Sequence, residues 1–205
     1  MKWFAPLRVK PWLPQRIRPE LQEPRGLAAV SGQRLGLGIF LVVVSVLFLL
    51  FIISYQLRMD YQDWRPVSEP WQLWMSTLLL LAGSVSLQMA SVAARRPSEI
   101  RTMQLLKAAG VLTLAFLIGQ LWAWWVMIDQ GNTVGSNPAN SFFYLITGVH
   151  AVHIVGGLVA WLRVISRMHY GGSLESFQLS IQLCTTYWHF LFVIWLFLFY
   201  MLLVT

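Results

Sequence analysis

The stretch Leu35–Leu57 reads LGLGIFLVVVSVLFLLFIISYQL and contains no charged residue. A helix that crosses a membrane needs about 20 consecutive, largely apolar residues, and this stretch supplies them. Four more charge-free stretches follow, at 70–94, 108–128, 130–162 and 176–205. We therefore predict an all-α integral membrane protein with five transmembrane helices. The predicted spans are about 36–56, 71–93, 107–128, 141–163 and 179–203.

The composition argues against several classes of protein. Of the 205 residues, 57% are hydrophobic and 11% are charged, and the mean hydropathy is +0.61. Soluble domains carry about a quarter charged residues, and a globule of this size could not hide so much apolar surface from water. A cytosolic enzyme, a nucleic-acid-binding module and a disordered protein are therefore disfavoured. The single cysteine, Cys184, excludes an internal disulfide and a zinc site built from several thiolates.

Lys and Arg are distributed unevenly between the two sides of the predicted bundle. Arg58 and Arg65 are the only basic residues on one side. The other side holds Lys2, Arg8, Lys10, Arg16, Arg18, Arg25, Arg34, Arg95, Arg96, Arg101, Lys107, Arg163 and Arg167. Because basic loops stay preferentially in the cytoplasm, we predict a cytoplasmic N-terminus and a C-terminus on the outside. This orientation accounts for the net charge of +7, so no nucleic-acid partner is needed to explain it.

Residues 1–34 differ from the rest of the chain because they are basic and rich in proline. We expect them to form an irregular cytoplasmic segment that precedes a five-helix membrane domain at 35–205. Trp3, Phe4 and Trp12 alternate with basic residues in this segment. Two interpretations stay open: an anchor at the membrane interface, and a loosely ordered tail that supplies positive charge.

Polar side chains recur at helical spacing inside the predicted spans. Such groups are costly in hydrocarbon and usually face protein. In span two, Thr77, Ser84, Gln88 and Ser91 share one helix face. We expect spans two to five to form a bundle with polar interhelical contacts, and span one to be more peripheral. Further candidates for these contacts are Gln120, Thr147, His150, His153, Gln182, Thr185 and His189.

Three histidines, His150, His153 and His189, lie inside predicted spans. A bis-histidine haem needs two facing ligands, whereas His150 and His153 point about 60° apart around one helix. We therefore expect these histidines to be hydrogen-bonded fasteners between helices four and five, packed as neighbours. No span carries a charged residue near its centre, which argues against a stand-alone pump, channel or transporter. The residues indicate no catalytic or metal-binding site in this chain.

The last two spans carry the most specific motifs. Span five contains Tyr187-Trp188-His189-Phe190 followed by Trp195-Leu196-Phe197-Leu198-Phe199. Span four contains Phe142-Phe143-Tyr144-Leu145, Thr147-Gly148-Val149-His150 and His153-Ile154-Val155-Gly156-Gly157. These motifs resemble the last two helices of cytochrome c oxidase subunit III. Shorter matches extend the resemblance over about residues 35–205, at Leu35-Gly36, Phe48, Tyr55, Pro70, Leu73-Trp74, Thr77-Leu78-Leu79-Leu80, Phe116, Gln120 and Trp124.

The resemblance is to the short, five-helix form of this family that occurs in bacterial oxidases. It implies an accessory, non-redox subunit of a proton-pumping haem-copper terminal oxidase in the bacterial inner membrane, which reduces dioxygen to water. The haems and coppers would lie in partner subunits, and this chain would bind none. It would pack mainly against subunit I, with subunit II as a further partner, and a larger respiratory supercomplex is left open. It would also bind phospholipid and support stability and proton uptake.

The resemblance also implies where lipid would bind. Helices of the family splay into a V that holds phospholipid, so we expect a cleft between spans one and two and spans three to five. Arg95, Arg96 and Arg101, at the cytoplasmic end of span two, are candidates for contacts with lipid headgroups. Alternatively, these arginines only set the orientation of the chain in the membrane.

This sequence departs from the family at three buried carboxylates. Their positions correspond to Val44, Ala123 and Phe192, so no role of those carboxylates carries over. Two other functions are kept as alternatives. One is an accessory subunit of nitric oxide reductase. The other is a b-type cytochrome membrane anchor that uses His150 or His153 together with His189.

Overall fold

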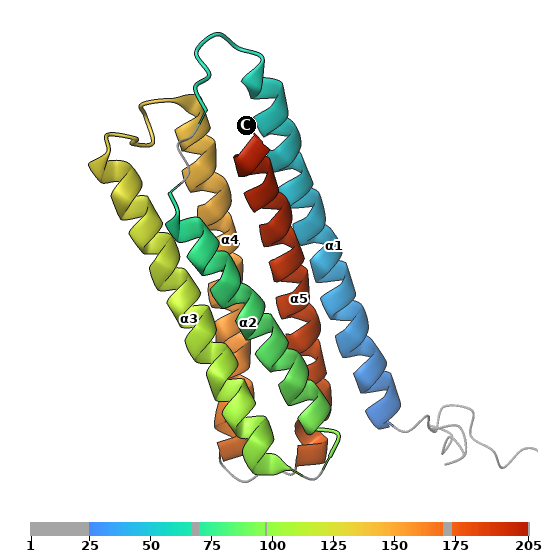
Figure 1. Ribbon diagram of the computed structural model, residues 1–205. Coiled ribbons are helices and arrows are strands. Elements are labelled where there is room, and N and C mark those ends of the chain that lie inside the picture. Colours follow the sequence, from blue (N-terminus) through green and yellow to red (C-terminus); the bar gives the residue numbers. More distant parts are fainter. Residues whose placement is uncertain (1–24, 67–69, 97, 170–173, 205) are drawn as a thin grey trace, which may run out of the picture. The chain divides into compact units, whose positions relative to one another are not determined.

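The computed structural model describes residues 25–66, 70–96, 98–169 and 174–204. The chain divides into two units, residues 1–36 and residues 37–205. In the first unit, the described residues 25–36 form the first turns of a helix. Five helices run through the described residues (Figure 1). They are α1 (Arg25–Met59), α2 (Gln72–Ala93), α3 (Glu99–Asp129), α4 (Pro138–His169) and α5 (Leu174–Val204).

All five helices are long and apolar enough to cross a membrane, so the all-α class and the five predicted spans are confirmed. Four of the helices extend clearly past the predicted spans, because their polar and charged ends continue the helix beyond the apolar stretch. The expectation of an irregular segment up to residue 34 is wrong for residues 25–34, which are helical. No proline follows Pro24 until Pro66, so nothing interrupts the helix there. Residues 1–24, with Trp3, Phe4 and Trp12, lie outside the described residues.

The second unit is a helix bundle in which α2 has a central place. Helix α2 packs along α3 and also against α5, while α4 packs against α5 and α3. The expected division into a first pair of helices and a last group of three is therefore wrong. Helix α2 belongs with α3 and α5, because its polar face is hydrogen-bonded to both helices and a small residue lets it approach α3 closely. For example, a Cβ at Gly83 would lie within 3.4 Å of Thr113 on α3.

Helix α1 joins the bundle through long aromatic side chains. The Phe48 ring lies 5.5 Å from the ring of His153, and the Tyr55 ring lies 5.7 Å from that of Phe142, both on α4. Val44, Phe48 and Tyr55 are buried, but most other large apolar side chains of α1 are exposed. This agrees with the expectation that span one is peripheral.

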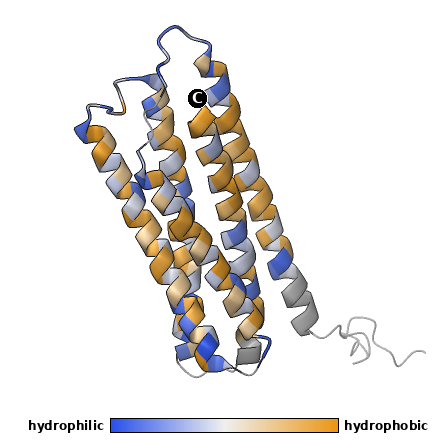
Figure 2. Ribbon diagram, viewed as in Figure 1, coloured by the Kyte–Doolittle hydropathy of each residue, from blue (hydrophilic) through white to orange (hydrophobic). Residues whose placement is uncertain are grey.

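The outer surface of the helices is predominantly apolar. Figure 2 shows hydrophobic residues along all five helices, with hydrophilic residues concentrated toward the helix ends and connections. Leu78 on α2, Ile118 on α3, Val152 on α4 and Phe197 on α5 are each more than 60% exposed. In water such a surface would be unfavourable, whereas lipid or an apolar partner solvates it without cost.

Candidate functional site

The polar face of α2 forms hydrogen bonds to both of its neighbours. The side-chain amide of Gln120 on α3 donates to the Ser76 hydroxyl at 2.8 Å. On the other side, the indole N–H of Trp195 on α5 donates to the Thr77 hydroxyl at 2.8 Å. The hydroxyl of Thr185 on α5 also lies 3.3 Å from the backbone carbonyl oxygen of Leu87. These contacts hold α2 between α3 and α5.

His189 fastens α5 to α2. Its Nδ1 atom is hydrogen-bonded to the Ser84 hydroxyl at 2.5 Å, and its Nε2 atom to the Gln88 side-chain oxygen at 3.1 Å. Because the Gln88 oxygen can only accept, Nε2 carries the proton and Nδ1 accepts from Ser84. Both ring nitrogens are therefore used within the bundle. The helix that His189 contacts is α2, whereas the sequence predicted α4.

His150 and His153 do not form the hydrogen bonds between helices that the sequence predicts. His153 Nδ1 bonds to the backbone carbonyl of Val149, one turn earlier in its own helix. His150 is fully buried, and neither of its ring nitrogens has a hydrogen-bond partner among the described residues. Its ring is stacked on the indole of Trp195 at 5.2 Å. The expectation of a polar fastener is thus wrong at His150, because aromatic rings surround the position.

Helices α4 and α5 nevertheless pack as neighbours, as predicted. The contact between them depends on aromatic side chains and a small residue. The Tyr187 hydroxyl donates to the backbone carbonyl of His153 at 2.8 Å. A Cβ at Gly157 would lie 2.8 Å from the Tyr187 ring and 3.0 Å from that of Trp188, so only glycine allows this approach.

Buried indoles bonded to threonine hydroxyls connect α3 to its neighbours. Trp124 on α3 donates to Thr147 on α4 at 3.1 Å, and Trp188 on α5 donates to Thr113 on α3 at 3.0 Å. Each threonine donates its own proton to a carbonyl one turn back, which leaves the oxygen free to accept the indole N–H. Sequence reasoning missed Thr113. The residue could have been found from the rule that a buried indole N–H needs a hydrogen-bond acceptor.

The remaining predicted residue, Gln182, is half-buried on α5 and has a contact of its own. The seven candidate residues do not converge on one centre. Gln120, Thr147, Thr185 and His189 join different pairs of helices, and His150 and His153 lie on the side of α4 that faces α1 and α5. The positions of the missing carboxylates are apolar, and Val44 and Ala123 are buried. Among the described residues, these hydrogen bonds hold helices together.

Metal ions and haem are held in proteins mainly by His, Cys, Asp and Glu side chains. In the described part of the chain, no group of three or more His, Cys, Asp or Glu side chains could hold a metal ion. A b-type cytochrome anchor would need a free nitrogen on His189, but both nitrogens are bonded to α2. His150 has free nitrogens, but its ring is enclosed by Phe48, Phe116 and Trp195.

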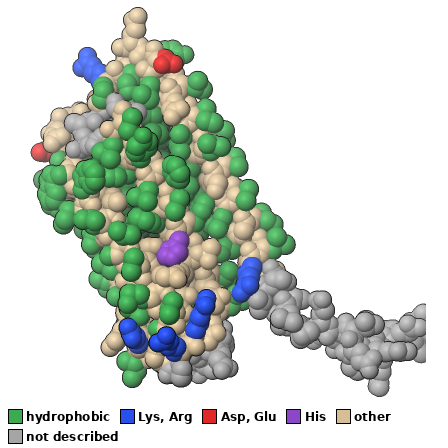
Figure 3. Space-filling model, turned by 45° about the vertical axis from the view of Figure 1, so that its right-hand side comes forward, with side chains coloured by type: hydrophobic (Ala, Val, Ile, Leu, Met, Phe, Trp, Pro, Cys, Tyr) green, Lys and Arg blue, Asp and Glu red, His purple; other side chains and the backbone are tan. Residues whose placement is uncertain are grey.

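A basic cavity of about 230 Å³ opens between the end of α2 and the start of α3. Arg96 and Arg101 line it, whereas Arg95 is exposed and does not. In the view of Figure 3, Lys and Arg side chains gather at the lower end of the molecule. Other residues that line the cavity are Gln88, Met89, Val92, Ser98 and Leu105.

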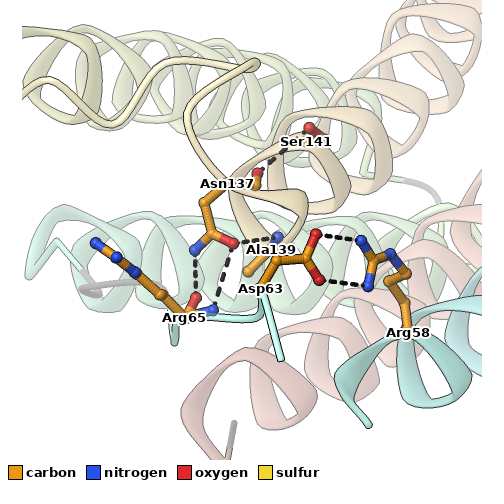
Figure 4. Close-up of polar contacts among 6 residues, drawn as sticks. All are labelled: Arg58, Asp63, Arg65, Asn137, Ala139 and Ser141. Carbon is orange, nitrogen blue, oxygen red and sulfur yellow. Dashed lines mark hydrogen bonds and ion pairs between the residues drawn. The ribbon is translucent and has the colours of Figure 1, made fainter. Parts of the chain in front are cut away.

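Polar contacts at the opposite end brace the connection between α1 and α2 against α4 (Figure 4). The Asn137 side chain accepts from the backbone N–H of Arg65 and donates to its carbonyl. It also accepts from the N–H of Ala139, so it caps α4, where Pro138 is the first residue. Arg58 forms an ion pair with Asp63 and holds the pKa of that exposed carboxyl below its usual value, chiefly through its hydrogen bonds.

The comparison with known families identifies the chain. The model of the family described as cytochrome c oxidase subunit III matches residues 19–204. The chain belongs to this family. The resemblance that the motifs of spans four and five carry is therefore confirmed, and it covers all five helices.

Three relatives illustrate the similarity to the subunit III family. A probable cytochrome c oxidase subunit 3 of Mycobacterium leprae is 30% identical over 138 residues, which are 66% of this chain and 68% of the relative. That of Mycobacterium tuberculosis is 28% identical over 140 residues, or 67% and 69% of the two chains. The cytochrome c oxidase subunit 3 of Thermostichus vulcanus is 29% identical over 180 residues, or 82% and 85%.

Two general statements follow from membership in the subunit III family. A subunit of an oxidase implies a complex of several chains, and this chain is one component of such a complex. Five helices able to span a membrane, together with bacterial relatives, indicate a multi-pass membrane protein of a bacterium.

Proposed function

We propose that this chain is an accessory, non-redox subunit III of a proton-pumping haem-copper terminal oxidase in the bacterial inner membrane. The complex reduces dioxygen to water in aerobic respiration, and the haems and coppers lie in other subunits. The observation that carries the proposal is the family match over residues 19–204, which includes the five helices of the described residues. The N-terminus faces the cytoplasm and the C-terminus the periplasm, since the basic residues are distributed that way.

The role of the chain in the complex is structural. Hydrogen bonds from α2 to α3 and α5 hold a bundle whose outer surface is apolar, and such a surface suits subunit I and lipid acyl chains. The chain packs mainly against subunit I, with subunit II as a second partner, and it binds phospholipid. It supports proton uptake by stabilising the complex rather than by carrying protons, because Val44, Ala123 and Phe192 stand where the resemblance places the family's buried carboxylates.

Metal analysis of the separated chain tests the non-redox part of the proposal. The chain is released from the purified complex with a stronger detergent, and its iron, copper and visible spectrum are measured. We expect far less than one iron or copper per chain and no Soret band, because both His189 nitrogens are bonded to α2. Circular dichroism confirms that the chain is still helical. One equivalent of haem retained by the folded chain would contradict the proposal.

A further inference from the structure

Polar side chains lie on a partly exposed face of the neighbouring helices α2 and α5, inside the membrane-spanning part of the bundle. We propose that this face binds a transmembrane helix of a partner chain, which offers an oxygen acceptor to the side-chain amide of Gln88. The α2–α5 face comprises Leu81, Val85, Gln88, His189, Val193 and Leu196. The inference deepens the proposed function, on which it rests for the identity of the partner as an oxidase subunit.

The polar side chains lie well inside the hydrocarbon region. Helix α2 has 22 residues, which at 1.5 Å per residue span roughly 33 Å, close to the thickness of about 30 Å of a bilayer core. Ser84, which bonds to His189, is then roughly 14 Å from the end of α2 at Ala93, and Gln88 is roughly 8 Å from it. Acyl chains supply no hydrogen-bond partner at this depth, so exposed polar groups here are unfavourable unless protein covers them.

Gln88 presents an unused donor on this face. Its side chain is exposed, and its oxygen accepts from His189 Nε2 at 3.1 Å. The Ser84 hydroxyl donates to the other ring nitrogen, so the half-buried His189 ring is fixed in place. Among the described residues, the amide nitrogen of Gln88 has no hydrogen-bond partner. Its N–H groups can therefore donate to oxygen acceptors of another chain.

Apolar side chains around this donor suit the packing of a helix. Leu81, Val85, Val193 and Leu196 are each between 40% and 49% exposed. A partner helix seated over the face covers them and brings an acceptor opposite Gln88. Membrane helices associate through this combination of close packing and hydrogen bonds, whereas a lipid acyl chain would cover only the apolar part.

A photo-cross-linker in place of Val85 tests which molecule covers the α2–α5 face. The tagged, full-length chain carries p-benzoylphenylalanine at this position, and its native membrane is irradiated before purification. The control has the same replacement of Val152 on α4, which is more exposed than Val85 but lies on another helix. We expect the Val85 position to be cross-linked to a different protein chain at least tenfold more than the Val152 position.

The cross-linked products are identified by mass spectrometry. Cross-linking of the Val85 position to lipid alone would overturn the proposal, as would cross-linking to a second copy of this chain. Equal yields of cross-linked protein at the two positions would overturn it as well, because they would show that the α2–α5 face is not selected.

The hydrogen bond is tested by Gln88→Met, which removes the donor and keeps a side chain of similar length. We expect the fraction of the chain that stays in the complex in mild detergent to fall about threefold to tenfold. The control is Ser84→Ala, which removes a bond to His189 but leaves the Gln88 amide, and it should stay within twofold. No loss in Gln88→Met, or an equal loss in Ser84→Ala, would contradict the proposed contact. Thermal unfolding in detergent confirms that each variant is folded.

The identity of the cross-linked chain separates this proposal from the proposed function. A chain that co-purifies with oxidase subunits but is cross-linked at Val85 only to lipid contradicts the interface alone. Cross-linking at Val85 to a protein of a complex that does not reduce dioxygen contradicts the proposed function and leaves the interface standing.

Discussion

Replacing Trp195 with alanine is expected to lower the free energy of unfolding by roughly 3 kcal/mol. The side chain is fully buried, and its indole N–H donates to Thr77 on α2 at 2.8 Å. Its ring is also stacked on His150 and meets the edge of Phe116 at 5.3 Å. In lipid, packing contacts contribute more to this energy than transfer out of water does. We therefore expect a value at the lower end of those measured for the same kind of substitution in soluble proteins. The measurement is the unfolding of the full-length chain in mild detergent.

Two further variants separate the contributions of Trp195. Trp195→Phe keeps most of the aromatic contacts and loses the hydrogen bond, so it should cost about 1 kcal/mol. Trp125→Ala removes an indole that is 64% exposed, and it should change the stability by less than about 0.5 kcal/mol. If Trp195→Ala were no more destabilising than Trp125→Ala, the packing of α2, α4 and α5 around this indole would be wrong.

Replacing Gly110 with alanine is expected to destabilise the contact between α3 and α4 by roughly 1–3 kcal/mol. A Cβ at this position would overlap the ring of Trp161 on α4. The ring has little freedom to move, because it is buried and its N–H donates to the backbone carbonyl of Leu106 at 3.0 Å. The effect should appear as a lower midpoint temperature of unfolding in detergent.

Gly156→Ala is the matched control for this prediction. A Cβ at Gly156 on α4 would have no atom of the bundle within 4 Å. The variant should therefore be neutral or slightly stabilising, since alanine is the better helix former. Combining Gly110→Ala with Trp161→Leu should recover part of the stability lost to the overlap. A Gly110→Ala chain as stable as the Gly156→Ala chain would contradict the close approach of α3 and α4.

The number and class of the helices could be predicted from the sequence because the membrane imposes them. A charge-free stretch such as Leu35–Leu57 admits few structures other than a spanning helix, since backbone polar groups must be satisfied within the segment. The helix ends were less predictable. Residues 99–106 at the start of α3 include Glu99 and Arg101, and nothing in an apolar pattern indicates that a helix continues through them.

The pairing of the helices could be predicted only in part. The spacing of Thr77, Ser84 and Gln88 correctly put them on one face of α2, but helical periodicity does not say which helix lies opposite. His189 was therefore assigned to a contact with α4, whereas it bonds to Ser84 and Gln88. His150 was expected to be hydrogen-bonded because it is polar, yet it is enclosed by aromatic rings that come from three other helices.

The residues that contact lipid headgroups could also be predicted only in part from the sequence. Arg95, Arg96 and Arg101 are equivalent in the sequence as basic residues near the end of a span. Arg96 and Arg101 line the cavity, whereas Arg95 is exposed outside it. Sequence reasoning could identify the basic end of the bundle but could not select the residues that form a concave site there.

The most direct measurement is affinity purification of the tagged, full-length chain from its native membrane in mild detergent. Haem, copper and oxygen consumption are determined in the eluate, and nitric oxide reduction is assayed in parallel. If the chain is an oxidase subunit III, it should elute with haem- and copper-containing subunits in a fixed ratio, in a preparation that reduces dioxygen. Elution of the chain alone, or with a complex that reduces nitric oxide but not dioxygen, would contradict this function.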